Sequence, residues 1–248
     1  MTRNRLGGTV GGVVAILSAC GVANADISYE VFTLVATVGG ESGSFVATTD
    51  MGTWDDQGNF YWNLDNPIDI KTKDGSVLAT LGTASVTFIA DPVIHLNFNV
   101  QANNQNTAFS VGSGLLSFPT ISNAVGAASA AVSITDVNGN GVTFTPDAAG
   151  AHLSHYNGEV PGGTQFASLL NSGFSAGAFA TDTASDEFPG GGGFAPIGVG
   201  VFDMSARWSF TLTAFDLASG TSVYTIVPAP GSLALLGLGG LAAIRRRR

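Results

Sequence analysis

Basic residues are scarce in the long middle part of this chain. The sequence holds 9 Lys and Arg against 18 Asp and Glu, and six of the basic residues lie at its two extreme ends. Residues 26–226 therefore carry only Lys71, Lys73 and Arg207 against all 18 carboxylates, a net charge of −15. Nucleic acid and anionic membrane surfaces repel such a domain, so we expect no nucleic-acid partner.

Cysteine is also nearly absent, because Cys20 is the only one in the chain. A single cysteine forms no intramolecular disulfide, so residues 26–226 must be stabilised by a hydrophobic core. About 200 residues suffice for one such domain. The 34 glycines and the shortage of lysine argue against a helical domain.

The first residues have the pattern of a signal peptide. Arg3 and Arg5 form a positive region, residues 6–19 are apolar, and Ala23 to Ala25 supply small residues for cleavage before Asp26. A lipobox-like sequence ending at Cys20 is the competing interpretation, in which that cysteine is lipidated. We expect residues 1–25 to be a signal peptide and the protein to be exported.

The last 22 residues have three parts in a fixed order. Residues 227–231 are proline-rich and non-helical, residues 233–244 are apolar, and four arginines end the chain. The apolar run is short for a membrane span, which needs about 20 residues, although a bilayer can thin locally. A short buried helix with a basic end is the alternative interpretation. The residues of the predicted sorting motif are Pro228, Ala229, Pro230, Arg245, Arg246, Arg247 and Arg248.

This tail resembles the PEP-CTERM sorting signal, with Ala229 in place of the usual central glutamate. The resemblance implies export, processing by signal peptidase and an exosortase-like enzyme, a short transmembrane helix in residues 227–248, and display at the cell surface or in the extracellular matrix. It covers about the last tenth of the chain and implies nothing about the activity of residues 26–226.

The middle of the chain has the pattern of an all-β domain. In residues 93–101, Ile94, Leu96, Phe98 and Val100 share one face, and polar side chains occupy the other. The same period of two places Trp62 and Trp208 in the core. We therefore predict an antiparallel β-sandwich, jelly-roll-like, over residues 26–226, with an irregular β-barrel as the alternative.

Residues 146–200 show the least regular pattern. We expect one short helix at residues 165–170 and a glycine-rich loop at residues 190–193. Two hairpins are predicted, one joining residues 127–136 to 142–145 through two Asn-Gly dipeptides, and one turning at residues 218–220.

The same Asn-Gly segment has the ligand spacing of a calcium loop. Asp136, Asn138 and Asn140 occupy positions 1, 3 and 5, a glycine follows at position 6, and Asp147 is at position 12. Calcium is thus the one candidate cofactor, and an ordinary hairpin turn is the competing interpretation. A second acidic patch consists of Asp50, Asp55, Asp56, Asp65 and Asp69.

Three further features offer weak signals for chemistry. Gly173 to Gly177 matches a nucleophile elbow, but the chain lacks the strand–turn–helix context that the elbow requires. His152 and His155 have no further spaced partners for zinc or for a catalytic triad, and we interpret them as loop histidines. Trp54, in an acidic turn-rich stretch, is a candidate for stacking on a sugar ring.

These observations favour an exported, non-catalytic surface or matrix protein. The alternative is a carbohydrate- or calcium-binding β-sandwich module in the same setting, with extracellular polysaccharide as its partner. A secreted hydrolase is the third hypothesis, and the sequence contains no coherent catalytic constellation to support it.

Overall fold

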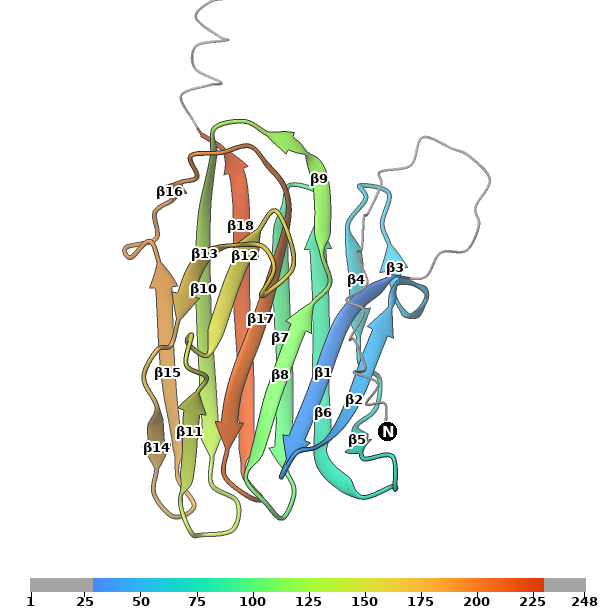
Figure 1. Ribbon diagram of the computed structural model, residues 1–248, viewed down its shortest axis with the longest axis vertical. Coiled ribbons are helices and arrows are strands. Elements are labelled where there is room, and N and C mark those ends of the chain that lie inside the picture. The colour runs from blue at the N-terminus through green and yellow to red at the C-terminus, as the bar shows by residue number, and fades with distance from the viewer. Residues whose placement is uncertain (1–28, 230–248) are drawn as a thin grey trace, which may run out of the picture.

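The computed structural model describes residues 29–229, which form two antiparallel β-sheets packed face to face (Figure 1). The predicted signal peptide, the apolar tail segment with its predicted transmembrane helix, and the arginine cluster lie outside these residues. Within them, a single 3₁₀ turn at Thr49–Met51 accompanies the strands. No helix in residues 29–229 is long and apolar enough to cross a membrane.

The first sheet, sheet A, has the order β13-β12-β17-β8-β1-β2, with β9 and β11 also paired to β17 and β14 paired to β11. Its strands are β1 (Glu30–Val38), β2 (Glu41–Thr48), β8 (Thr107–Ser113), β9 (Leu116–Ile121), β11 (Val142–Pro146), β12 (His152–Tyr156), β13 (Thr164–Leu169), β14 (Phe174–Ala176) and β17 (Val201–Leu212).

The second sheet, sheet B, has the order β15-β10-β18-β7-β6-β4-β3, with β16 paired to β10 and β5 paired to β6. Its strands are β3 (Thr53–Trp54), β4 (Phe60–Asn63), β5 (Ile68–Lys71), β6 (Val77–Ile89), β7 (Val93–Ala102), β10 (Ala124–Thr135), β15 (Thr181–Phe188), β16 (Ala195–Pro196) and β18 (Leu217–Pro228).

The core lies between the sheets, where alternate side chains of each strand meet. Trp208 of sheet A is fully buried and contacts Phe98 of sheet B, with ring centroids 5.4 Å apart. At another point Phe32 of sheet A and Trp62 of sheet B lie 5.1 Å apart. The predicted sandwich and the predicted inward faces of the strands carrying Trp62, Phe98 and Trp208 are confirmed.

Three local predictions are wrong. Residues 165–169 of the predicted helix belong to strand β13, which pairs with β12. Residues 218–220 lie inside β18, and the preceding turn is at residues 213–216. Strands β10 and β11 form no hairpin, because β10 pairs within sheet B and β11 within sheet A. The Asn-Gly segment therefore crosses from one sheet to the other.

Strand β18 carries the chain to the border of the predicted sorting motif. Pro228 is its last residue, opposite Ala124 of β10, and the N–H of Ala229 donates to the carbonyl oxygen of Asn123 at 2.9 Å. The next residue, Pro230, already lies outside the described part of the chain. The described part of the chain thus ends within the motif.

Candidate functional site

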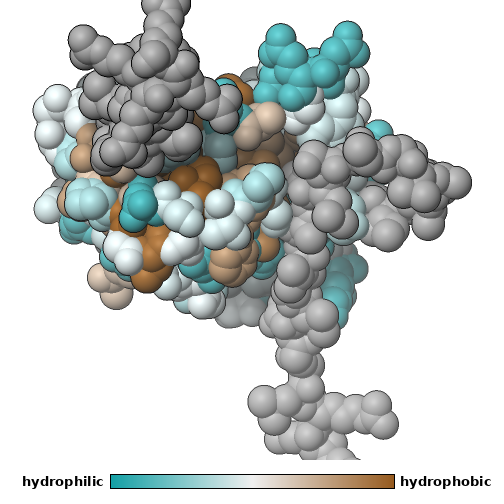
Figure 2. All heavy atoms as spheres, turned by 90° about the horizontal axis from the view of Figure 1, so that it is seen from above, coloured by the Kyte–Doolittle hydropathy of each residue, from teal (hydrophilic) through white to brown (hydrophobic). Residues whose placement is uncertain are grey.

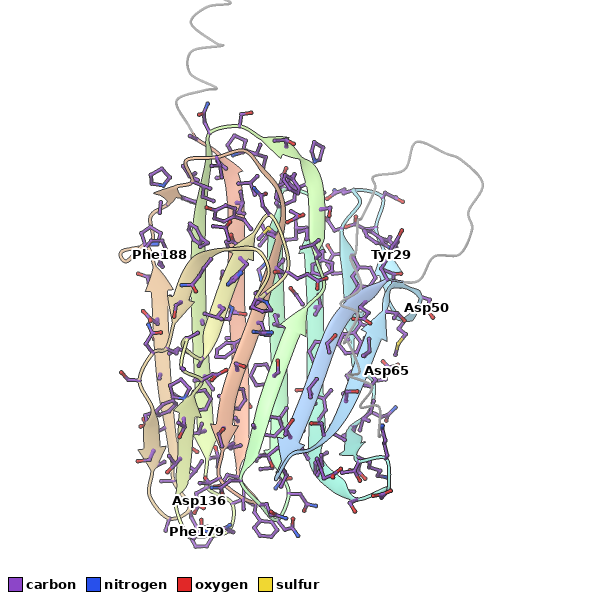
Figure 3. All side chains as sticks on the ribbon, viewed as in Figure 1. Tyr29, Asp50, Asp65, Asp136, Phe179 and Phe188 are labelled. Atoms are coloured by element: carbon purple, nitrogen blue, oxygen red, sulfur yellow. The ribbon has the colours of Figure 1, made fainter. Side chains whose placement is uncertain are left out.

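Four turns meet at one end of the sandwich, which we call the loop end: residues 103–106, 136–141, 177–180 and 213–216 (Figures 1 and 3). The strand register places them there, because Thr135 pairs with both Thr181 and Leu217. The opposite end, where β18 finishes, is called the exit end. The loop end gathers segments from both sheets, so its side chains depend on the tertiary fold for their arrangement.

Asp136 joins two of these turns. Its side chain is only 3% exposed, and its Oδ2 accepts hydrogen bonds from the backbone N–H groups of Gly139 at 2.9 Å and Phe179 at 2.6 Å. Its own N–H donates to the carbonyl oxygen of Ala180 at 3.0 Å. A buried carboxylate satisfied in this way fixes the relative positions of residues 136–141 and 177–180.

A second buried carboxyl, Asp216, lies beside Asp136. It accepts a hydrogen bond from the N–H of Val137 at 3.3 Å and one from the Thr213 hydroxyl at 2.5 Å. Burial raises the pKa of Asp216, and the nearby charge of Asp136 raises it further. Burial also opposes ionisation of Asp136, but hydrogen bonds from Phe179 and Gly139 outweigh it and lower the pKa of Asp136. Of the two carboxyls, Asp216 is therefore the one that takes up a proton first as the pH falls.

Two phenylalanine side chains project from the loop end into solvent. Phe179 is 74% exposed and Phe215 is 45% exposed. Both have left-handed backbone conformations, with φ of 55° and 68°. This region is uncommon for bulky residues and persists where the surrounding structure imposes it. The ring of Phe179 lies against Gly139, where any side chain would collide with it.

Amide side chains occupy the same group of turns as the two rings. Residues 104–106, Asn-Gln-Asn, are exposed. The Asn138 amide donates to the carbonyl oxygen of Ala214 at 3.1 Å, and Oδ1 of Asn106 accepts from the N–H of Ala214 at 3.2 Å. Phenyl rings among fixed and free amides present apolar faces together with donors and acceptors, while both carboxyl groups are buried below. Such a surface suits a ligand that has apolar ring faces and hydroxyl groups.

Three of the four predicted calcium ligands lie in the sheet-crossing turn, and the fourth does not. The five residues of β11 separate Asn140 from Asp147, a rise of about 17 Å. The Asp147 carboxylate accepts a hydrogen bond from the N–H of Ala148 instead. Oδ1 of Asn138 accepts from the N–H of Asn140 at 3.0 Å. Among residues 29–229, no group of three or more His, Cys, Asp and Glu side chains has an arrangement that could hold a metal ion.

The second predicted acidic patch is dispersed along one edge of the sandwich, where Figure 3 labels Asp50 and Asp65. Asp55 accepts hydrogen bonds from Gln57 and Asn59 within its own turn, which lower its pKa despite some desolvation. Asp69 forms an ion pair with Lys71 at 3.5 Å. The acidic residues here serve separate turns and strands.

The predicted exposure of Trp54 is confirmed at 45%, but the residue lies on edge strand β3. Its ring packs on Phe60, with centroids 5.0 Å apart. The Phe60 ring therefore already contacts Trp54, which leaves less of the Trp54 ring for a sugar than the projecting rings of the loop end provide.

The two histidines are not loop residues, contrary to prediction, because both lie in β12 and are buried. His152 packs edge-on against Trp208, and complete burial lowers its pKa to about 3. His155 is 5% exposed, and its Nδ1 contacts the carbonyl oxygen of Gly163 at 3.1 Å. Ser175 of the elbow-like sequence pairs with Thr143 in sheet A.

The outer face of sheet B carries a shallow hollow of about 430 Å³ along β10. It is lined by Ser129, Ala130, Ala131, Ser185, Asp186, Glu187, Thr221, Ser222 and Val223. The register explains the hollow, because the small side chains of Ser129 and Ala131 lie between the taller ones of β15 and β18. The lining of this hollow contains no aromatic ring, unlike the loop end.

Sequence reasoning missed Phe179, Phe215 and Asp216. A local signal existed for the second and third, since Phe215 and Asp216 directly follow the alternating strand that contains Trp208. Phe179 follows the glycine-containing segment 173–177, and nothing in its neighbours indicates a left-handed backbone. Their meeting with Asp136 is set by pairing between distant strands.

The geometry defines a class of protein, a two-sheet antiparallel β-sandwich with an aromatic and amide-rich loop end. No family model matches the chain, and no curated protein matches it. Among solved structures it is similar to TmCBM61 in complex with beta-1,4-galactotriose, at 9% identity over 55% of this chain and 71% of that chain, with a TM-score of 0.23. It is also similar to a structure of infectious bursal disease virus strain Gx, at 11% identity over 86% of this chain and 54% of that chain, with a TM-score of 0.25. Likeness at this level carries no functional argument.

Proposed function

We propose that residues 29–229 are a non-catalytic carbohydrate-binding module that binds an uncharged glycan at the loop end. The supporting observation is the pair of exposed rings, Phe179 and Phe215, held on left-handed backbones among amide side chains. Aromatic faces stack on the apolar face of a pyranose, and amides hydrogen-bond its hydroxyls. The strong negative charge of the domain disfavours an anionic polymer.

Binding without catalysis agrees with the chemical groups that this end presents. Its exposed groups are phenyl rings and amides, which do not transfer protons. Its two carboxyls, Asp136 and Asp216, are buried and used to hold the turns. A bound sugar would meet a fixed surface and no general acid or base.

We also propose that the module belongs to an exported, C-terminally sorted protein of the cell surface or matrix. The signal-like residues 1–25 and the resemblance of residues 227–248 to an exosortase substrate support this proposal. The position of Pro228 adds to it, since the chain leaves the sandwich at the end farthest from Phe179 (Figures 1 and 3). A domain tethered at the exit end would direct its loop end away from the membrane.

Affinity electrophoresis of the purified protein in gels containing neutral polysaccharides tests the binding proposal. Phe179→Gly and Phe215→Gly should each weaken retardation at least about tenfold, since a hot-spot ring contributes on that order. Their melting temperatures should be retained or rise, because glycine adopts the left-handed backbone without strain. Loss of a ring that costs affinity but not stability is the signature of a binding residue.

Phe194→Ala and Phe202→Ala are the matched controls, because these rings are 49% and 48% exposed and belong to segments near the exit end. They should migrate as the wild type does. Retardation that is equal in the Phe179→Gly, Phe215→Gly and wild-type proteins, or absent with every neutral polysaccharide, would refute the binding proposal.

The sorting proposal has a separate test. Mass spectrometry of the mature protein from its native host should find a C-terminus near Pro230 and no Arg245 to Arg248. Recovery of the intact C-terminus in the cytosolic fraction would overturn it.

A further inference from the structure

The chain contains three Asn-Gly dipeptides, at Asn138, Asn140 and Asn157. In such a pair the nitrogen of the glycine can attack the side-chain carbonyl carbon of the asparagine, because glycine has no side chain to hinder the approach. The reaction requires the asparagine side chain to leave its hydrogen-bond partners and rotate toward the main chain. The hydrogen bonds of each amide therefore decide which dipeptide reacts.

Three hydrogen bonds hold the dipeptide of Asn157 and Gly158. Its Nδ2 donates to the carbonyl oxygen of Gly200 at 2.9 Å, and its Oδ1 accepts from the N–H of Phe202 at 3.1 Å. The attacking nitrogen, that of Gly158, donates to Oδ1 of Asp203 at 2.6 Å. Reaction here would require several hydrogen bonds to break at once.

Asn138 is held in the same manner. Its Nδ2 donates to Ala214, and its Oδ1 accepts from the N–H of Asn140. The nitrogen of Gly139 donates to the buried Asp136 carboxylate. The two turns of the loop end thus depend on the intact amide of Asn138.

Asn140 differs from both. Its side chain is exposed, and among the described residues its amide has no hydrogen-bond partner. The N–H of Gly141 lies close enough to the Asp136 carboxylate to help lower the pKa of Asp136. The Asn140 side chain is therefore free to rotate toward the main chain, and only the contact of the Gly141 nitrogen with Asp136 has to be given up.

We propose that Asn140 is a site of spontaneous deamidation, which converts it to aspartate or isoaspartate in the folded protein. The Gly141 nitrogen forms a bond to Cγ of Asn140 and loses its proton, and the side-chain nitrogen leaves as ammonia. Water then opens the resulting succinimide at either carbonyl. The net change consumes one water and releases one ammonia, with no oxidant or enzyme.

The product places a new carboxylate at the loop end, in the same turn as Asp136 and near Phe179. The surface that is neutral in the newly made protein would gain a negative charge with age. This inference rests on the hydrogen bonds of the three dipeptides and stands independently of the proposed glycan binding.

Peptide mass spectrometry of the purified protein after incubation in mildly alkaline buffer tests the proposal. Asn140 should convert at least about tenfold faster than Asn138 or Asn157, since each of those must break two or more hydrogen bonds. In urea-denatured protein the three sites should convert at similar rates, because the protection is tertiary. An Asn140→Ser variant should lose the fast conversion and keep its fold.

Faster conversion at Asn138 or Asn157 in the folded protein would overturn the proposal. So would a folded Asn140 that stays intact while the denatured chain converts at all three sites. An Asn138→Ser variant separates the structural amide of Asn138 from the reactive amide of Asn140. In this variant Asn140 should convert at the wild-type rate or faster.

Discussion

Both ends of the sandwich expose apolar side chains, but they hold them in different ways. At the exit end Phe194, Val199 and Phe202 are about half exposed, and Figure 2 shows brown apolar surface there among polar residues. Phe194 follows a run of four glycines, residues 190–193, in which the described contact is a hydrogen bond from Gly191 to Glu187. At the loop end, two buried carboxyls fix the turns that present Phe179 and Phe215.

This difference shows that exposure alone does not mark a binding site. A ring beside a glycine run, such as Phe194, loses more conformational entropy when it binds than a ring that is already fixed. The left-handed backbones of Phe179 and Phe215 strengthen the distinction, since the fold maintains an unfavourable conformation at both positions. The loop end is therefore the better candidate for specific recognition.

The largest expected effect comes from a core substitution that destabilises both ends of the sandwich together. Trp208→Ala should lower the free energy of unfolding by about 3–5 kcal/mol, because it leaves a cavity where the indole ring contacts Phe98 and His152. It also removes the hydrogen bond that Nε1 of Trp208 donates to the Ser222 hydroxyl at 3.2 Å. Urea denaturation should show the loss at both ends together. Trp54→Ala, at an exposed edge, is the matched control and should cost less than about 1 kcal/mol.

Replacing one carboxylate at each end, Asp136 at the loop end or Glu187 at the exit end, should affect the two ends differently. Asp136→Ala should accelerate hydrogen exchange at Gly139 and Phe179 at least about tenfold, because both amides lose their acceptor in a buried site. Glu187→Ala should affect only the exposed segment around Gly191 and leave the melting temperature unchanged. Equal protection of the loop-end amides in Asp136→Ala and wild type would show that the turns are fixed by other contacts.

The pH dependence should separate the loop end from the core. The pKa of His152 is lowered from its ordinary value to about 3, so the unfolded chain binds the extra proton first and stability falls as pH drops below about 6.5. The pKa of Asp216 is raised, so its contribution is complete below the ordinary aspartate pKa and is lost as pH rises through the raised value. The two groups therefore oppose one another.

Denaturation across this pH range should resolve them in two variants. His152→Phe should remove roughly 2–3 kcal/mol of the loss seen between about pH 6.5 and pH 4. Asp216→Asn should match or exceed the wild type at neutral pH, because the amide removes the second charge beside Asp136. If His152→Phe loses as much stability at acid pH as the wild type does, protonation of another group causes the loss.

The smallest expected effect concerns two neighbouring amides of the loop end. Asn140→Asp, which mimics the deamidated form, should change glycan affinity by only a few fold and leave the melting temperature unchanged, since its side chain is exposed and unpartnered. Asn138→Ala should lower the melting temperature as well, because its amide holds the turn at Ala214. Calorimetry with gel retardation of each variant would sharpen the distinction between a surface amide and a structural one.

Much of the strand pattern could be predicted because side-chain alternation is a local property. Residues 93–101 identified an inward face with Ile94 and Phe98, and the same period placed Trp62 and Trp208 in the core. The segment at residues 165–170 could not be assigned in this way. Its pairing with β12, which is decided elsewhere in the chain, overrides its weak local preference.

The composition and local pattern of the sequence by themselves determined an acidic all-β domain without disulfides and the inward faces of its clearest strands. Only the tertiary structure decided that the Asn-Gly segment joins two sheets, that Asp147 lies far from Asp136, and that Asp216 lies close to it. The physical reason is that turn chemistry and alternation act over a few residues. The partner of a strand, and hence the neighbours of a turn, is set by packing across the whole chain.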